Sequence, residues 1–337
     1  MISQEHSEAV ARALNQTFGV TRFDDIRRVS RGPNSNLAYR IVVQGSAFLL
    51  RINTRKGDPK RQYLCMHAAA EAGLAPRVWY SRAEDRISIT DFVQAAPFPV
   101  KEALGRLPTL LRELHALPAF DRAPYNTTCT FLVDKGPALD GFLRKFQTAN
   151  VLPEAQMAEF LARHAELAAV YRCDAAEMVS SHNDLFKPDN ILFDGKRVWL
   201  VDWEAAFLND RYADLAVVAN QVVTNEEEEM AYLQEYFGSR PNPYQRARFY
   251  LMQQLSHLFY TMAFLYMGSD KAIDWSAAVP ELGDYHRGIW AGEIDLADKD
   301  VRIVYSRVHW QRFLQNVQQA RYQEALKIVS GRHASVV

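Results

Sequence analysis

Hydrophobic and polar residues alternate in short runs along the first quarter of the chain. A helical pattern over Ser7–Phe18 comes first, and five β-prone runs follow it, separated by glycine, proline and polar residues. These runs are Asp25–Ser30, Leu37–Val43, Ala47–Ile52, Arg77–Ser81 and Arg86–Thr90. Gln44–Ser46 is typical of a tight turn between the second and third runs, and a helical pattern over Lys60–Ala72 separates the third run from the fourth. We therefore predict five strands with one helix between the third and the fourth.

Helical spacing dominates the remainder of the chain. Apolar residues recur every three or four positions over Leu104–Leu117, Met157–Val170 and Ala247–Phe264. One strand-like island interrupts these helices, because Ile191–Phe193 and Val198–Val201 are β-prone and the Asp-Gly pair between them is a strong hairpin signal. We therefore predict an α+β fold of two lobes. Residues 1–92 form a small five-stranded antiparallel β lobe with one helix, and residues 93–337 form a larger, mainly helical lobe that carries the hairpin.

Composition and charge exclude several classes of protein. The 337 residues include 39 Lys and Arg against 40 Asp and Glu, so the net charge of −1 provides no basic surface for a nucleic-acid backbone. No apolar run is long enough to span a membrane. Met1–His6 lacks the features of a signal peptide, and the three cysteines are odd in number and far apart, which predicts neither a disulfide framework nor a paired-cysteine metal site. We expect a cytoplasmic protein with reduced cysteines that binds no nucleic acid and no membrane.

The hairpin is flanked by side chains that suit phosphate chemistry. Asp184 and Asn190 precede its first strand, and Asp202 follows its second. Because a hairpin brings its two flanks together, these three side chains can converge. Two carboxylates and an amide oxygen suit a hard cation such as Mg²⁺, and phosphoryl transfer uses one Asp to orient the attacking hydroxyl and another Asp with an Asn to hold metal. Each residue alone is compatible with a solvated turn, but the two flanking motifs together favour a phosphotransferase site.

These motifs resemble those of a known superfamily. The segment from His182 to Asn190, followed by Asp202–Glu204, is similar to the catalytic and metal-binding motifs of the aminoglycoside phosphotransferases and choline/ethanolamine kinases, which are relatives of the protein kinases. Further segments are similar to other parts of the same superfamily: Gly32–Tyr39, Gly73–Pro76, Leu110–His115 and Arg211–Ala216. The resemblance covers about residues 26–260 and implies a protein-kinase-like two-lobed fold.

The resemblance implies a role for each matching residue. Asp184 is the catalytic Asp, which accepts or orients the proton of the substrate hydroxyl, and Asn190 and Asp202 hold Mg²⁺. Arg51 stands where the third-strand lysine of kinases contacts the α- and β-phosphates, and an arginine keeps the charge and can bind phosphate oxygens through two nitrogens. ATP and Mg²⁺ are the implied cofactors.

The resemblance also implies an ATP site between the lobes. Ser35 and Asn36 belong to the nucleotide loop after the first strand, and backbone groups of Asp91 and Val93 meet adenine at the connection between the lobes. Lys187 follows the catalytic Asp closely. It has two interpretations, a contact with the γ-phosphate and a solvated loop lysine.

Two positions depart from the pattern of the superfamily. Five residues separate Asp184 from Asn190 where kinases have four, so Phe186 looks like an insertion that must bulge if Asn190 is to reach the metal. Gln62 stands where a helix glutamate is expected to pair with the third-strand base, so a contact between Arg51 and Gln62 would be weaker than an ion pair. These departures keep a non-catalytic nucleotide-binding module as a rival interpretation.

Three other polar residues flank the same motifs. The resemblance implies that His182 packs the catalytic loop, and no further His or Cys accompanies it at the spacing that a metallohydrolase would need. Asp214 is expected to brace the catalytic loop through hydrogen bonds. Glu204 is the candidate substrate residue, since a carboxylate beside the site favours a cationic acceptor, with an acidic residue at a helix start as the alternative interpretation.

The pattern as a whole predicts an ATP-dependent small-molecule kinase that transfers the γ-phosphate to an alcohol hydroxyl. The resemblance favours a choline- or ethanolamine-type amino alcohol as the acceptor, and an aminoglycoside or another hydroxylated metabolite is the alternative. A non-catalytic ATP-binding pseudokinase and a metal-dependent phosphohydrolase are the alternative classes. The expected partner is thus a small alcohol, and the sequence does not indicate the oligomeric state.

Overall fold

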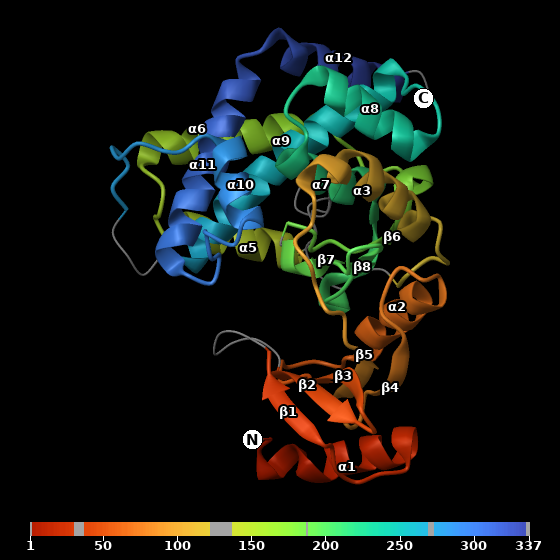
Figure 1. Ribbon diagram of the computed structural model, residues 1–337. Helices are drawn as coiled ribbons and strands as arrows, with labels where there is room; N and C mark the ends of the chain where they lie inside the picture. The colour runs from red at the N-terminus through yellow and green to blue at the C-terminus, as the bar shows by residue number, and fades with distance from the viewer. Residues whose placement is uncertain (1, 30–36, 122–136, 187, 269–272, 335–337) are drawn as a thin grey trace.

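The computed structural model describes residues 2–29, 37–121, 137–186, 188–268 and 273–334. Figure 1 shows a small lobe with a β-sheet joined to a larger helical lobe. The combination of an antiparallel sheet of five strands with a larger helical part confirms the predicted fold class.

The small lobe is built on one antiparallel sheet. Its strands are β1 (Asp25–Arg28), β2 (Leu37–Val43), β3 (Ser46–Ile52), β4 (Val78–Arg82) and β5 (Ile87–Asp91). They lie in the order β1-β2-β3-β5-β4, so β5 inserts between β3 and β4. Helix α2 (Lys60–Glu71) connects β3 to β4, as the sequence pattern predicts, and helix α1 (Gln4–Phe18) precedes the sheet.

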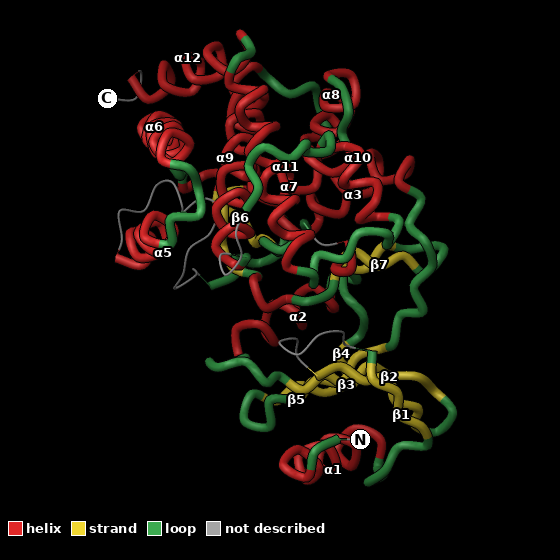
Figure 2. The backbone as a smooth tube through the Cα atoms, turned by 90° about the vertical axis from the view of Figure 1, so that its left-hand side faces the viewer, coloured by secondary structure: helices red, strands yellow, loops and turns green. Residues whose placement is uncertain are grey.

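The two helices of the small lobe lie on opposite sides of the sheet. Side chains alternate across β3, so Phe48, Leu50 and Ile52 are buried together. Helix α1 packs against them through Val10 and Leu14, which belong to the same apolar cluster. Figure 2 shows α2 on the other side, between the sheet and the larger lobe. Helix α2 is therefore the helix of the small lobe that reaches the larger lobe.

The larger lobe is mainly helical. Its described helices are α3 (Val100–His115), α5 (Pro137–Thr148), α6 (Glu154–Val170), α7 (Arg211–Val222), α8 (Glu226–Phe237), α9 (Pro243–Met267), α10 (Leu282–Trp290), α11 (Lys299–Val317) and α12 (Ala320–Ala334). Two short antiparallel pairs lie among them: β6 (Met178–Ser181) with β9 (Phe207–Asp210), and β7 (Ile191–Phe193) with β8 (Val198–Leu200). The second pair is the predicted hairpin. Within the part of the chain that the structure describes, no helix is both long enough and apolar enough to cross a membrane.

A buried ion pair joins the central helix α9 to the end of β9. Arg248 and Asp210 are both fully buried, and the Arg248 guanidinium donates to the Asp210 carboxylate at 2.5 Å. The same carboxylate accepts a bond from the Tyr171 hydroxyl (3.1 Å) and caps α7 by accepting from the Tyr212 amide (3.0 Å). Asp210 thus connects three elements of the core, and its charge depends on Arg248 for compensation.

The cysteines do not all behave as the sequence predicts. Cys65 on α2 is a free, buried thiol, and burial raises its pKa to about 11, so it stays protonated. Cys173 is disulfide-bonded, so the expectation of reduced cysteines throughout is wrong for this residue. Distance along the chain does not reveal which cysteines meet in space. Cys129 lies outside the described residues.

Three buried histidines lie together on α9, α10 and α11. The Nδ1 atoms of His257 and His309 are 2.8 Å apart, so one ring donates to the other. His286 contacts the carbonyl oxygen of Asn220 and the hydroxyl of Tyr305, each at 2.9 Å. Burial lowers the pKa of His257 to about 3 and that of His286 to about 4, and it lowers the pKa of His309 well below its usual value.

The lowered pKa values of these histidines predict that acid destabilises the folded chain. Because their pKa values are lower in the folded chain than the unfolded value of about 6.5, the unfolded chain binds more protons below about pH 6.5. The contribution of the neutral histidines to the free energy of unfolding is fully present above that pH. It falls by up to about 1.4 kcal/mol per pH unit for each histidine as the pH drops. Urea unfolding over this pH window measures the slope, which should become shallower in His286→Asn. Equal stability of the wild-type chain at both ends of the window would contradict the prediction.

Candidate active site

The hairpin β7–β8 lies on the side of the larger lobe that faces the small lobe (Figure 1). A short 3₁₀ turn over Pro188–Asn190 leads into β7. The Val201 amide donates to the carbonyl oxygen of Asn190 (3.0 Å), one step beyond the last pair of the ladder. The hairpin therefore places Asn190 beside the residue that precedes Asp202, as the sequence predicts.

Asn190 and Asp184 are joined directly. The Nδ2 atom of Asn190 donates to Oδ2 of Asp184 (3.0 Å) and to the backbone carbonyl oxygen of Asp184 (2.7 Å). Because these bonds use the amide nitrogen, the amide oxygen is the atom that Asn190 offers to a cation. Among the described residues no group of three His, Cys, Asp or Glu side chains could hold a metal ion. A site made of two Asp and one Asn still fits Mg²⁺, which prefers oxygen ligands and keeps several waters.

Asp202 links the two lobes. Its φ angle of 71° lies in the left-handed region that residues other than glycine rarely adopt. Its Oδ1 atom accepts a hydrogen bond of 2.9 Å from Nη1 of Arg51 on β3, and the two side chains are 29% and 21% exposed. The arginine predicted to bind phosphate thus meets the carboxylate predicted to bind metal.

Gln62 has a different partner from the one considered in the sequence analysis. The Asn53 side chain, at the end of β3, donates to Oε1 of Gln62 at 3.1 Å, and both residues are buried. Arg51 donates to Asp202 instead. The contact considered between Arg51 and Gln62 is thus replaced by two others, from Asn53 to Gln62 and from Arg51 to Asp202.

Phe186, the extra residue of the catalytic loop, is anchored in the larger lobe. Its ring packs against Tyr260 and Phe264 of α9, with centroid distances of 5.1 and 5.6 Å. The neighbouring carbonyl oxygen of Leu185 accepts from the Gln221 side chain (2.8 Å). The extra residue is thus absorbed by packing against α9, and the contact between Asn190 and Asp184 is kept.

Asp214 braces the catalytic loop, as the sequence predicts. Its two carboxylate oxygens accept the backbone amides of His182 and Asn183, each at 2.8 Å. Burial of Asp214 opposes its negative charge, but the hydrogen bond from His115 and the nearby His182 hold its pKa below the usual value. His182 in turn donates from Nε2 to the carbonyl oxygen of Val201 (2.9 Å) and so ties the catalytic loop to the segment before Asp202.

Glu204 forms an ion pair with the small lobe. Its carboxylate contacts the guanidinium of Arg55, which lies in the loop between β3 and α2. The Glu204 side chain is 17% exposed and that of Arg55 is 58% exposed. A cationic acceptor at Glu204 would therefore share the carboxylate with Arg55 or displace it.

Comparison with known proteins identifies the family of this site. Residues 25–250 match the family model described as the phosphotransferase enzyme family. The chain belongs to this family. Within the phosphotransferase, the matched region contains the small-lobe sheet, the catalytic loop and the hairpin. No curated protein matches the chain in sequence.

Solved structures share the fold of this phosphotransferase at low sequence identity. A choline/ethanolamine kinase family protein from Mesorhizobium loti has a TM-score of 0.66 and 17% identity, covering 96% of this chain and 99% of that one. The choline kinase LicA from Streptococcus pneumoniae has a TM-score of 0.56 and 13% identity, covering 86% and 98%. A spectinomycin phosphotransferase solved with ADP and spectinomycin has a TM-score of 0.54 and 11% identity, covering 90% and 98%. These similarities show the fold and leave the acceptor of the phosphotransferase open.

The predicted nucleotide-binding residues are only partly described. Asp91 ends β5, where its backbone amide donates to the carbonyl oxygen of Arg77 (2.9 Å), and half-buried Val93 follows in the connection between the lobes. Ser35, Asn36 and Lys187 lie outside the described residues. The roles of all five residues in this phosphotransferase stay predictions.

Sequence reasoning missed two arginines of the phosphotransferase. Arg55 contacts the Glu204 carboxylate, and Arg61 on α2 donates to the backbone carbonyl oxygens of Glu204 and Ala206. Together with Arg51, they bring three guanidinium groups of the small lobe onto the segment 202–206. The only indication in the sequence is the density of arginine after β3, which by itself is typical of any solvated loop.

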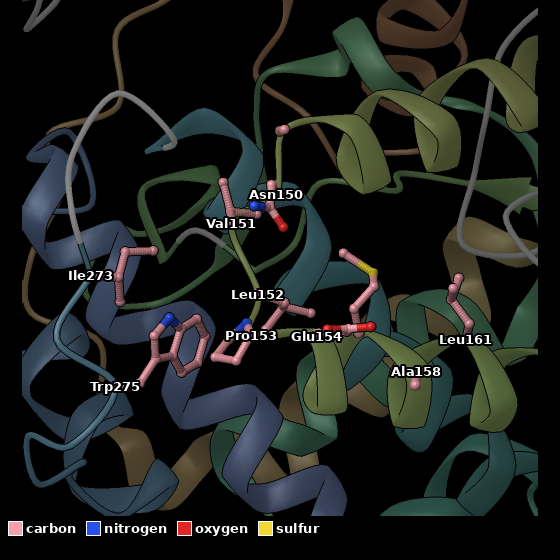
Figure 3. A pocket seen from close by; sticks show the side chains of 11 residues that line it. Asn150, Val151, Leu152, Pro153, Glu154, Ala158, Leu161, Ile273 and Trp275 are labelled. Atoms are coloured by element: carbon pink, nitrogen blue, oxygen red, sulfur yellow. The ribbon is translucent and has the colours of Figure 1, made fainter.

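A separate pocket of about 750 Å³ lies where α5 and α6 meet (Figure 3). Leu152, Pro153 and Leu161 line it from this side, and Ile273 and Trp275 line it from the segment before α10. The residues that line this pocket do not include Asp184, Asn190 or Asp202. It is therefore distinct from the hairpin site of the phosphotransferase.

Proposed function

We propose that this phosphotransferase transfers the γ-phosphate of ATP to the hydroxyl of a small-molecule alcohol, with Mg²⁺ as the second cofactor. The observation that carries the proposal is the joined pair of Asp184 and Asn190, with Asn190 bonded to Val201, the residue before an Asp202 that contacts Arg51 of the small lobe. Phosphoryl transfer requires this separation of roles, with one carboxylate at the acceptor and another at the metal. Solved neighbours bound to AMP or ADP support a nucleotide as the donor.

The chain's own residues account for the steps of this reaction. Asp184 accepts or orients the proton of the acceptor hydroxyl, while Asn190 holds its carboxylate in place through the bond of 3.0 Å. Asn190 and Asp202 would hold Mg²⁺, which when bound neutralises charge on the phosphate oxygens. Arg51 carries a fixed positive charge for the α- and β-phosphates. The buried Asp214 keeps the loop amides of His182 and Asn183 fixed, so that Asp184 needs little reorganisation during the reaction.

A choline- or ethanolamine-type amino alcohol is the acceptor that we favour. Similarity to choline and ethanolamine kinases among the solved structures supports this choice. Glu204 is the proposed contact for the ammonium group, because its carboxylate already binds one cation, the guanidinium of Arg55. The similarity to a spectinomycin phosphotransferase supports an aminoglycoside or another hydroxylated metabolite as the second candidate.

Formation of ADP from Mg·ATP tests the proposal against a panel of alcohols that includes choline, ethanolamine and spectinomycin. We expect turnover with one class of acceptor and none in an Asp184→Ala blank. Tight binding of ATP without turnover on any acceptor would favour the non-catalytic module. ADP formation that is independent of the acceptor would favour the phosphohydrolase.

Asp202→Ala is expected to weaken binding of Mg·ATP. The change removes a proposed metal ligand and the partner of Arg51, whereas loss of groups that only support a ligand already costs about 10- to 100-fold in metal affinity. We therefore expect the dissociation constant for ATP in the presence of Mg²⁺ to rise by at least about 10-fold. Isothermal titration calorimetry measures it, with Asp189→Ala, an exposed Asp in the turn that leads into β7, as the control. Unchanged Mg·ATP affinity in Asp202→Ala would refute the metal assignment.

A further inference from the structure

Arg61 holds the backbone of the segment that follows Asp202. Its Nη2 atom donates to the carbonyl oxygen of Glu204 (3.0 Å), and its Nη1 atom donates to the carbonyl oxygen of Ala206. Arg51 and Arg55, by contrast, contact carboxylates of the same segment. A guanidinium presents several N–H donors in a fixed plane, so one Arg61 side chain can fix two carbonyl groups relative to each other.

A second residue of α2 supports the same contact. Cys65 lies one turn after Arg61, and its thiol donates to the carbonyl oxygen of Ala206 at 3.8 Å. Ala206 is fully buried, and the guanidinium carbon of Arg61 lies 5.7 Å from the ring centroid of Phe207. Helix α2 thus contacts the segment 202–206 through Arg61 and Cys65 on one face of the helix. This segment, which begins with the proposed metal ligand Asp202, is called the metal-site segment below.

The contacts of α2 help to hold the backbone conformation at Asp202. A left-handed φ at a residue other than glycine persists where the surrounding structure holds it. On the side before Asp202, Val201 is fixed by His182 and Asn190. On the side after it lies a second 3₁₀ turn, Trp203–Ala205. Arg61 fixes the carbonyl groups of Glu204 and Ala206, and the Asn183 side chain donates to the carbonyl oxygen of Ala205 (3.1 Å). Arg61, together with the weaker donor Cys65, is therefore how the small lobe contributes to the backbone geometry at Asp202.

We propose that Arg61 is a positioning residue that sets the Asp202 carboxylate for Mg²⁺ from helix α2. In this chain Gln62 is bound to Asn53, and α2 acts on the site through the backbone of the metal-site segment. The inference rests on the proposed function, in which Asp202 holds the metal. It adds that the alignment of α2 with the larger lobe determines the affinity for Mg·ATP.

Binding of ATP to the full chain, measured by calorimetry with Mg²⁺ and again with EDTA, tests this proposal. Arg61→Ala should raise the dissociation constant about 10-fold with Mg²⁺, as expected for a group that orients a metal ligand, and should leave the value in EDTA unchanged. Arg61→Lys should give an intermediate loss, because an ammonium is a point charge that cannot hold two carbonyl groups in one plane. Arg106→Ala is the matched control. Arg106 on α3 also donates to a backbone carbonyl oxygen, that of Lys196 at 2.9 Å, but this residue lies in the turn of the hairpin, at the opposite end from Asp202.

Three results would overturn the inference. Arg61→Ala with wild-type affinity under both conditions would show that Asp202 needs no support from α2. An equal loss with Mg²⁺ and with EDTA would show that Arg61 only stabilises the contact between the lobes. Wild-type binding that does not depend on Mg²⁺ would overturn the metal assignment of Asp202 as well, which distinguishes failure of the proposed function from failure of this inference alone.

Discussion

Asp184→Ala is expected to lower kcat by about 100- to 10,000-fold, the contribution of a positioned general base. The variant removes the carboxylate that faces the acceptor hydroxyl in the proposed reaction. Asn190 loses one of its two acceptors but keeps the backbone carbonyl oxygen of residue 184 at 2.7 Å. Binding of Mg·ATP should therefore change little. Steady-state kinetics of ADP formation, combined with calorimetry of ATP binding, separates the two quantities.

Asp189→Ala provides the control for this variant. Asp189 is exposed and lies in the 3₁₀ turn just before Asn190, so its substitution changes the charge of the same loop without removing the proposed base. We expect its kcat to stay close to that of wild type, because the substitution leaves Asp184 and its bonds to Asn190 in place. A kcat of Asp184→Ala close to that of Asp189→Ala would show that the catalytic loop is assigned wrongly.

Arg248→Met is expected to destabilise the chain by about 3–5 kcal/mol. Methionine approximates the length of the apolar part of arginine but leaves the carboxylate of Asp210 buried without its compensating charge. Asp210 would retain only the Tyr171 hydroxyl and the Tyr212 amide as hydrogen-bond donors among the contacts described above. The free energy of unfolding in urea measures the loss.

Arg287→Met is the matched control for the buried pair. Arg287 also pairs with an aspartate, Asp284, but both side chains are well exposed, at 70% and 62%. Such surface pairs contribute about 0–1 kcal/mol, so this variant should unfold almost as the wild type does. A loss in Arg248→Met as small as that in Arg287→Met would contradict the view that Asp210 depends on Arg248.

Local patterns in the sequence were sufficient for most of the fold. Runs of β-prone residues bounded by glycine, proline and polar residues identified the strands of the small lobe, because such a preference belongs to each segment by itself. The Asp-Gly pair identified the hairpin, and the hairpin placed Asn190 near Asp202. The pair of β6 with β9 was not predicted, because each strand has only four residues and the pairing joins segments far apart in the chain.

The contacts between the lobes could not be predicted in the same way. Arg51, Arg55 and Arg61 lie close together in sequence, but their partners belong to a segment more than a hundred positions later. The partner of each arginine depends on the way in which long polar side chains from both lobes pack in the space between them. For the same reason the sequence does not reveal that the Asn53 side chain donates to Gln62.

The central claim is transfer of phosphate to an alcohol, and ³¹P NMR of the reaction tests it most directly. The chain is incubated with Mg·ATP and the acceptor that gives turnover in the panel, in parallel with Asp184→Ala. We predict that the γ-phosphate signal of ATP is replaced by that of a phosphate monoester of the acceptor, and that Asp184→Ala leaves the spectrum unchanged. Release of inorganic phosphate alone, or formation of the same ester by Asp184→Ala at the wild-type rate, would contradict the account.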